Sequence, residues 1–174
     1  SPKKSVSLNR GAQMPAWYDI LGLHEDAKQD QAGILESAKA ILDIVAEEER
    51  KGIPRNKIVI GGFSQGGAIA LTAGLLQQEQ FAGILALSTY LPIKDHFVQM
   101  KALLKVASDT PIFMAHGTSD QVISYRWAEL SRKFMVNDLK CENVKFKTLP
   151  DMGHSVNDEE IQSITKFLLK VLKY

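Results

Sequence analysis

The chain has 174 residues, of which 45% are apolar and 24% charged, and its net charge is only +1. This composition is typical of a globular protein and predicts one domain over residues 1–174. It argues against a nucleic-acid-binding protein, because lysine and arginine are scattered among acidic residues, and no apolar run approaches the ~20 residues of a membrane span. The one cysteine, Cys141, cannot form an internal disulfide and favours a reducing compartment.

Strand-like and helix-like segments alternate along the chain. In order, we expect a helix at 31–51, a strand at 57–62, a helix at 65–77, a strand at 81–88, a helix at 94–106, a strand at 110–117, a helix at 124–138, a strand at 143–150 and a helix at 157–173. Short strands that are each followed by a helix predict an α/β protein with a parallel sheet and helices on its faces. The run at 57–62 is apolar throughout, which predicts a central strand.

A serine flanked by glycines follows the first strand, in Gly62-Phe63-Ser64-Gln65-Gly66. A phosphate-binding P-loop is excluded because Gly67 stands where that motif needs lysine, and the glycine order does not fit a dinucleotide fingerprint. The stretch does fit G-x-S-x-G, in which a nucleophilic serine sits on a sharp strand-to-helix turn. The alternative is a closely packed turn that carries an inert Ser64.

A nucleophilic serine needs a histidine base and a carboxylate that orients it. The hydrolase folds that use G-x-S-x-G supply them in the order Ser, Asp, His, and the chain offers Asp120 after the third strand and His154 after the fourth. Two rivals lie nearby: we interpret His116 as a structural histidine behind the site and Asp151 as a loop acid.

The remaining histidines, His24 and His96, lie in polar surroundings and are expected to be solvated. Because no cluster of His, Cys or carboxylate residues has metal-ligand spacing, we expect neither a metal nor a cofactor.

Several stretches together resemble the acyl-protein thioesterase and lysophospholipase/carboxylesterase family of α/β-hydrolases. They are MPAWYDI, EEERKGIPRNKIVIGGFSQGGAIAL, LSTYLP, HGTSDQVI and MGHSV, and the resemblance spans essentially the whole chain. It implies an α/β-hydrolase fold with a mostly parallel central sheet. It also implies a small cytoplasmic serine hydrolase that cleaves thioesters of S-acylated proteins, lysophospholipids or short carboxylic esters.

The resemblance implies a role for individual residues. Ser64 resembles the nucleophile, His154 the general base and acid, Asp120 its orienting carboxylate, and the backbone amide of Gln65 an oxyanion donor. Residues that resemble the wall of an acyl-binding channel are Trp17, Tyr90, Met14, Leu91 and Ile93. For Trp17 and Tyr90 a role as ordinary core aromatics is an equal alternative.

The family pattern also includes an N-terminal segment with a strand, an H-G-x-G-D-type loop and a helix, and the second oxyanion donor comes from that loop. The chain starts after this point of the pattern, so we expect it to be an N-terminally incomplete hydrolase domain. Two alternative functions stay open: a short-chain carboxylesterase, or an acyl- or lipid-binding protein with little turnover. We expect no nucleic-acid partner, at most transient membrane contact, and a monomer or weak homodimer.

Overall fold

The computed structural model describes residues 1–100 and 109–173. Its strands and helices, in chain order, are β1 Lys3–Val6, β2 Ala12–Pro15, α1 Gln31–Arg50, β3 Val59–Phe63, α2 Gln65–Leu75, β4 Gly83–Leu87, α3 Lys94–Met100, β5 Ile112–Gly117, α4 Tyr125–Asn137, β6 Val144–Leu149 and α5 Asp158–Leu172. Two single 3-10 turns, Ser7–Asn9 and Arg55–Lys57, complete the assignment.

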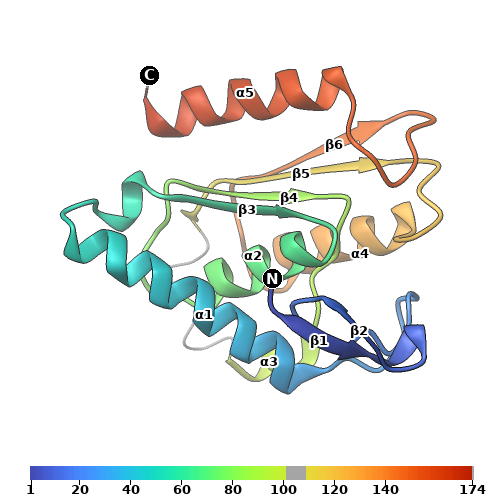
Figure 1. Ribbon diagram of the computed structural model, residues 1–174. Coiled ribbons are helices and arrows are strands. Elements are labelled where there is room, and N and C mark those ends of the chain that lie inside the picture. The colour runs from blue at the N-terminus through green and yellow to red at the C-terminus, as the bar shows by residue number, and fades with distance from the viewer. Residues whose placement is uncertain (101–108, 174) are drawn as a thin grey trace.

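Strands β3, β4, β5 and β6 form one parallel sheet in that order. Helices α1 to α4 lie on one face of the sheet and α5 lies on the other (Figure 1). The predicted α/β architecture is therefore confirmed, and each predicted strand lies within two residues of the observed one. Of the helix predicted at 94–106, residues 94–100 are helical and residues 101–106 lie outside the described part of the chain.

The core forms because α2, which is buried from Gly67 to Leu75, packs between α1 and the apolar strands β3 and β4. Its fully buried members include Ile34 of α1, Leu71 of α2 and Ile84 of β4. On the other face, Phe167 of α5 packs against Phe113 of β5, with their ring centroids 5.5 Å apart. Burying a large apolar side chain contributes about 1.5–3 kcal/mol, so these two layers hold the strands in register.

Cys141 belongs to this core, and burial raises the pKa of its thiol to about 11. A thiol with such a pKa is almost fully protonated at neutral pH and is a poor nucleophile.

The sequence did not predict the antiparallel hairpin of β1 and β2. Its pairing runs from Lys3 opposite Pro15 to Val6 opposite Ala12, and Arg10 and Gly11 take positive φ angles of 53° and 78° at the turn. In β1 only Val6 is buried, so the hairpin lacks the apolar alternation that normally indicates a strand.

The apolar run of β3 predicts a central strand, yet among the described residues β3 pairs with β4 alone and forms one edge of the four-stranded sheet. Its outward residue Phe63 is 37% exposed. Elsewhere the parallel strands end together at one edge, which is where side chains from successive loops can meet.

None of the helices in the described ranges combines the length and apolar character that crossing a bilayer requires.

Candidate active site

Ser64 occupies the turn between β3 and α2 with φ 54° and ψ −123°. A non-glycine residue with positive φ is strained, and such strain concentrates at functional sites. The turn is compact: a Cβ placed on Gly62 would lie 2.3 Å from the carbonyl carbon of Gly66. Glycine is therefore required at position 62, while the strained turn lifts the Ser64 side chain out of the strand.

The backbone of Ser64 is fixed on both sides. Its N–H donates to the carbonyl of Leu87 at 2.8 Å, which extends the pairing with β4. Its carbonyl accepts from the Thr89 hydroxyl at 2.7 Å and from the Gly67 N–H at 3.0 Å. The sequence alone did not single out Thr89, although its position directly after the second predicted strand was a signal for it. Thr89 thus locks the turn from the neighbouring strand.

The side chains of Ser64, His154 and Asp120 form a continuous hydrogen-bonded chain. His154 Nε2 lies 3.0 Å from Ser64 Oγ, and His154 Nδ1 lies 2.8 Å from Asp120 Oδ2. A carboxylate only accepts hydrogen bonds, so Nδ1 carries the proton and Nε2 presents its lone pair to the Ser64 hydroxyl. This is the arrangement in which a histidine can remove the proton of a serine.

The Asp120 side chain is fully buried, and each of its oxygens has a defined partner. Oδ1 accepts from the backbone N–H groups of Val122 at 2.8 Å and Ile123 at 2.9 Å, while Oδ2 faces His154. These bonds fix the position of the Asp120 side chain. Asp120 is thereby placed to orient His154 and to face the imidazolium formed when His154 takes a proton.

The loops that carry Asp120 and His154 are packed against each other. A Cβ on Gly117 would lie 2.0 Å from the Met152 carbonyl oxygen, so only glycine fits there. The N–H of Ser119 donates to that same carbonyl at 3.0 Å. Phe63 packs beside His154, with ring centroids 4.7 Å apart. These contacts restrict where the imidazole can point.

The rival residues lie where the sequence led us to expect them. His116 is buried behind Asp120, and its Nε2 faces Asp120 and the Ile123 carbonyl rather than Ser64. Asp151 is exposed, with φ 56°, and its backbone N–H donates to Thr118 Oγ1 at 2.9 Å. The loop therefore brings His154, and not its rivals, to Ser64. The other two histidines are at the surface, since His24 is exposed and His96 is partly exposed.

Gln65 begins α2, where backbone N–H groups lack partners within the helix and the helix dipole favours negative charge. Its backbone amide is thus suited to bind an oxyanion beside Ser64. Its side chain has a different role, because Oε1 accepts from the Trp17 N–H at 2.7 Å and Nε2 donates to the Tyr18 carbonyl at 2.8 Å. The hydroxyl of Ser37 in α1 donates to the Trp17 carbonyl. The segment after the hairpin is therefore clamped against the serine turn.

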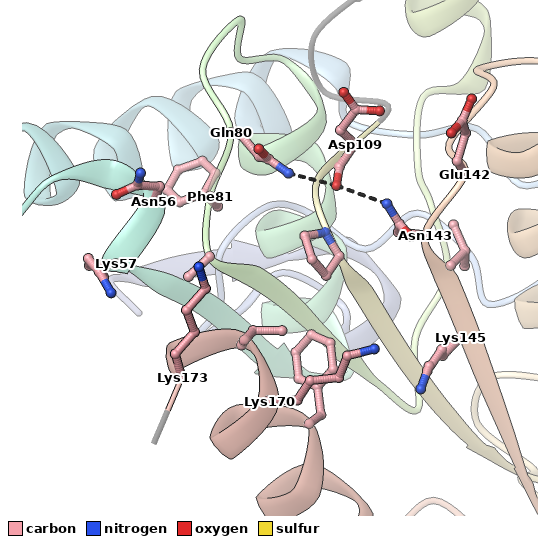
Figure 2. A pocket seen from close by; sticks show the side chains of 15 residues that line it. Asn56, Lys57, Gln80, Phe81, Asp109, Glu142, Asn143, Lys145, Lys170 and Lys173 are labelled. Carbon is pink, nitrogen blue, oxygen red and sulfur yellow. Dashed lines mark hydrogen bonds between the residues drawn. The ribbon is translucent and has the colours of Figure 1, made fainter.

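Two of the cavities lie against the sheet, one along β3 and one at the amino ends of the strands. One of about 330 Å³ adjoins the serine turn and is mostly apolar, with Trp17, Ile41, Gly62, Phe63 and Gly66 in its lining. The other, about 640 Å³, lies at the amino ends of β3 to β6 and against the end of α5 (Figure 2). Of these two cavities, the smaller is lined by the residues that flank Ser64 in the turn, Phe63 and Gly66.

The sequence model of a family described as Phospholipase/Carboxylesterase matches residues 1–172. The chain belongs to the phospholipase/carboxylesterase family. Acyl-protein thioesterase 1 of Yarrowia lipolytica is 45% identical over 174 residues, which cover 99% of this chain and 76% of that protein. Acyl-protein thioesterase 1 of Neurospora crassa is 42% identical, with 99% and 71% covered.

Solved structures of the same fold support this membership. Arabidopsis thaliana SOBER1 superposes with a TM-score of 0.90 at 28% identity, covering 99% of this chain and 81% of that one. Zea mays acyl-protein thioesterase 2 superposes with a TM-score of 0.85 at 27% identity, covering 99% and 79%. The fold is the α/β-hydrolase fold that the sequence resemblance implied.

The residues expected to line an acyl channel do not form one surface in this phospholipase/carboxylesterase. Trp17 is half-buried beside the serine turn, and its Nε1 lies 3.6 Å from a Cβ placed on Gly66. Met14 is partly exposed on β2, and its sulfur accepts from Asn9 Nδ2 at 2.9 Å. Leu91 and Ile93 are buried members of the main core.

Tyr90 is also buried, and each polar or aromatic group of its side chain has a partner. Its hydroxyl lies 2.9 Å from that of Tyr18 and 3.2 Å from Gln29 Oε1. Its ring stacks on Trp127 with centroids 3.6 Å apart, and burial raises the pKa of the Tyr90 hydroxyl. These contacts favour the alternative in which Tyr90 is a core aromatic, and they leave Trp17 as the candidate nearest to Ser64.

Proposed function

We propose that Ser64, His154 and Asp120 catalyse the hydrolysis of acyl thioesters or esters through an acyl-enzyme. Membership of the phospholipase/carboxylesterase family makes the chain a hydrolase of this class. The single observation that carries the catalytic assignment is the 3.0 Å approach of His154 Nε2 to Ser64 Oγ, with Asp120 on the other imidazole nitrogen.

In the acylation step, Ser64 Oγ forms a bond to the carbonyl carbon of the substrate while His154 Nε2 takes the hydroxyl proton. The carbonyl oxygen becomes an oxyanion, for which the Gln65 backbone N–H is a donor. When the tetrahedral intermediate collapses, the C–S or C–O bond breaks and His154 returns the proton to the leaving thiol or alcohol. Because a thiolate is a good leaving group, cleavage of a thioester depends less on proton transfer from His154 than cleavage of an ester does.

In the deacylation step, His154 takes a proton from water, whose oxygen attacks the acyl carbon. The second tetrahedral intermediate collapses with the bond to Ser64 Oγ breaking, and His154 returns the proton to Ser64. The carboxylic acid leaves and the site is restored. Asp120 keeps the imidazole in the required tautomer throughout, because its Oδ2 accepts from Nδ1–H.

The proposed substrates are S-acylated proteins or lysophospholipids, since relatives 37–45% identical to the chain carry the name acyl-protein thioesterase 1. The mostly apolar cavity beside Ser64 supports an acyl group as the part of the substrate that is recognised. We further propose a cytoplasmic protein, monomeric or weakly dimeric, with at most transient membrane contact.

A fluorophosphonate probe tests the proposal, because it forms a covalent bond only with an activated serine. Intact-mass spectrometry of the full-length protein is expected to show one adduct, absent in Ser64→Ala and present in the control Ser163→Ala, whose hydroxyl bonds within α5. Hydrolysis of thioesters with short and long acyl chains then separates a short-chain carboxylesterase from a thioesterase that prefers long chains. If the protein binds a fatty acyl ligand but forms no adduct with the probe, the hydrolase proposal is wrong and the alternative of an acyl-binding protein is supported.

A further inference from the structure

His116 lies directly behind the Ser64–His154–Asp120 chain, and the mechanism above does not use it. It is the penultimate residue of β5 and is 1% exposed. Its Nε2 lies 2.8 Å from the Ile123 carbonyl oxygen and 3.4 Å from Asp120 Oδ2. The same imidazole nitrogen therefore faces both the loop that follows Asp120 and the carboxylate oxygen that orients His154.

The protonation of this nitrogen follows from its partner. A backbone carbonyl only accepts hydrogen bonds, so Nε2 of His116 carries a hydrogen. That hydrogen is donated to the Ile123 carbonyl, and Asp120 Oδ2 lies 3.4 Å from the same nitrogen. The N–H of Ile123 in turn donates to Asp120 Oδ1 at 2.9 Å. His116, Ile123 and Asp120 thus form a closed group in which each member restrains the other two.

The groups around His116 are Asp120 and His154 on the loops, and the ring of Tyr125 from α4, whose centroid is 6.3 Å away at a steep angle. Burial lowers the pKa of His116, so the imidazole is neutral at physiological pH. It offers Asp120 the dipole of an N–H group without adding a positive charge that would compete with protonation of His154.

The other nitrogen of His116 shows that the imidazole is not there for packing alone. Among the described residues Nδ1 has no hydrogen-bond partner, and neither does the hydroxyl of buried Ser88, which follows the register pair Leu87–Ala115 on the adjacent strand. A buried polar atom without a partner carries a desolvation cost. An apolar side chain at position 116 would avoid this cost, so the benefit of histidine must come from Nε2.

We propose that His116 is a positioning residue for the catalytic carboxylate, resting on the function proposed above. Its Nε2–H holds the Asp120 loop through the Ile123 carbonyl and shares the charge of Asp120 Oδ2. Through Asp120 it sets how strongly His154 is held and how readily His154 accepts the serine proton.

Two variants of the full-length protein test this by moving one hydrogen-bond donor. The amide nitrogen of glutamine lies as many bonds from Cβ as Nε2 does, whereas that of asparagine corresponds to Nδ1. His116→Gln is therefore expected to keep kcat within about threefold of wild type, because its amide N–H can replace Nε2–H as the donor to the Ile123 carbonyl. His116→Asn is expected to lose about 10- to 100-fold in kcat with KM unchanged.

The pH profile gives a second readout that a purely structural role would not move. In His116→Asn, Asp120 Oδ2 loses the N–H dipole that lay 3.4 Å away and stabilises protonated His154 more, so the acid limb of kcat/KM is expected to move to higher pH. In His116→Gln the acid limb stays in place. The control is Ser131→Ala, which removes a buried hydroxyl whose hydrogen bonds go to the Leu91 N–H and the Trp127 carbonyl and not to Asp120. It is expected to lower thermal stability and leave the acid limb unchanged.

The positioning role is wrong if His116→Asn retains the kcat and acid limb of wild type, or if both variants lose activity equally and only in step with stability. If His116→Asn does not fold, His116→Met, which keeps the volume and removes the donor, carries the same expectations. Labelling of wild-type Ser64 by the fluorophosphonate keeps the two proposals apart: labelled wild type with an unaffected His116→Asn sinks the positioning role alone, and unlabelled wild type sinks both.

Discussion

The two edges of the parallel sheet differ in what they contain. At the carboxyl edge, the loops after β3, β5 and β6 bring Ser64, Asp120 and His154 together over distances of 3.0 Å or less. At the amino edge there is a larger cavity of about 640 Å³ with four lysines around an apolar floor, where Gln80 and Asn143 both donate to the Asp109 carbonyl (Figure 2). By cavity volume the amino edge would be the candidate site, whereas the proposed catalytic side chains lie at the carboxyl edge.

The difference teaches that buried polar pairs locate this site better than cavity size does. Ser64, Ser88 and Asp151 take positive φ angles at the carboxyl ends of strands, but Lys173 at the amino edge does so too, so strain marks the site only together with the buried pairs. Such conformations persist only when the surrounding structure holds them. The lysines of the amino edge, by contrast, are exposed at Lys57, Lys145, Lys170 and Lys173.

The largest effect is expected for Asp120→Asn at the carboxyl edge. The amide can no longer enforce the His154 tautomer that Ser64 needs, so kcat should fall on the order of 10,000-fold. Steady-state hydrolysis of a 4-nitrophenyl ester measures it. Asp151→Asn, a change of the same kind at an exposed residue of a neighbouring loop, is the control and should resemble wild type.

A smaller effect is expected when a methyl group is added to the serine turn. Gly62→Ala places Cβ 2.3 Å from the backbone of Gly66, and overpacking of this kind should cost about 1–3 kcal/mol of unfolding free energy and distort the turn. Gly66→Ala meets only Trp17 Nε1 at 3.6 Å and replaces a glycine of α2 with a better helix former, so it should be neutral or stabilise the fold by up to about 1 kcal/mol. Urea unfolding of both variants, with their hydrolysis rates, checks this; equal costs would contradict the close-packed turn.

A still smaller effect is expected when Glu160 is changed. In contrast to the paired carboxylate of Asp120, its side-chain oxygens are buried without a hydrogen-bond partner among the described residues. Burial raises the pKa of Glu160, so the folded state holds this proton more tightly than the unfolded state does. Stability from this group is therefore present at low pH and lost as pH rises through the folded pKa. Glu160→Gln should be more stable than wild type by about 1 kcal/mol at pH 8.

The difference in stability between Glu160→Gln and wild type should disappear as the pH falls from 8 toward 4. Thermal unfolding of both proteins between these pH values measures it. The control is Glu159→Gln, which removes an exposed ion pair with Lys147 and should change stability little at any pH. A stability gain that is independent of pH would show that ionisation of Glu160 is not its cause.

The smallest effect is expected at the amino edge. Lys145→Gln and Lys170→Gln alter the lining of the larger cavity and should leave kcat and KM for thioester hydrolysis at wild-type values. A loss of activity in either variant would break the comparison, because it would connect the larger cavity to the chemistry.

The strands and helices could be predicted because their apolar periods are local properties of the sequence. The turn at Ser64 could be predicted because G-x-S-x-G is a steric requirement written in five consecutive residues. The hairpin before Trp17 could not, since its strands have almost no buried face. Whether Tyr90 lines a channel or fills the core depended on Tyr18, which is 72 positions away in the sequence.

The same limit applies to the contacts that hold the candidate catalytic residues in place. The bonds of the Gln65 side chain reach 47 and 48 positions back along the chain, and the Thr89 hydroxyl bonds a backbone carbonyl 25 positions away. No local pattern specifies such pairs, because they depend on how the loops pack in three dimensions.

The bond between Ser64 and His154 joins residues 90 positions apart, across β4, β5, β6 and the helices between them. Reactivity of the serine therefore requires nearly the whole sheet to be assembled at once. A covalent serine probe applied to this protein counts completely folded molecules, and its labelling rate along a denaturant gradient would measure the cooperativity of the fold as well as its catalysis.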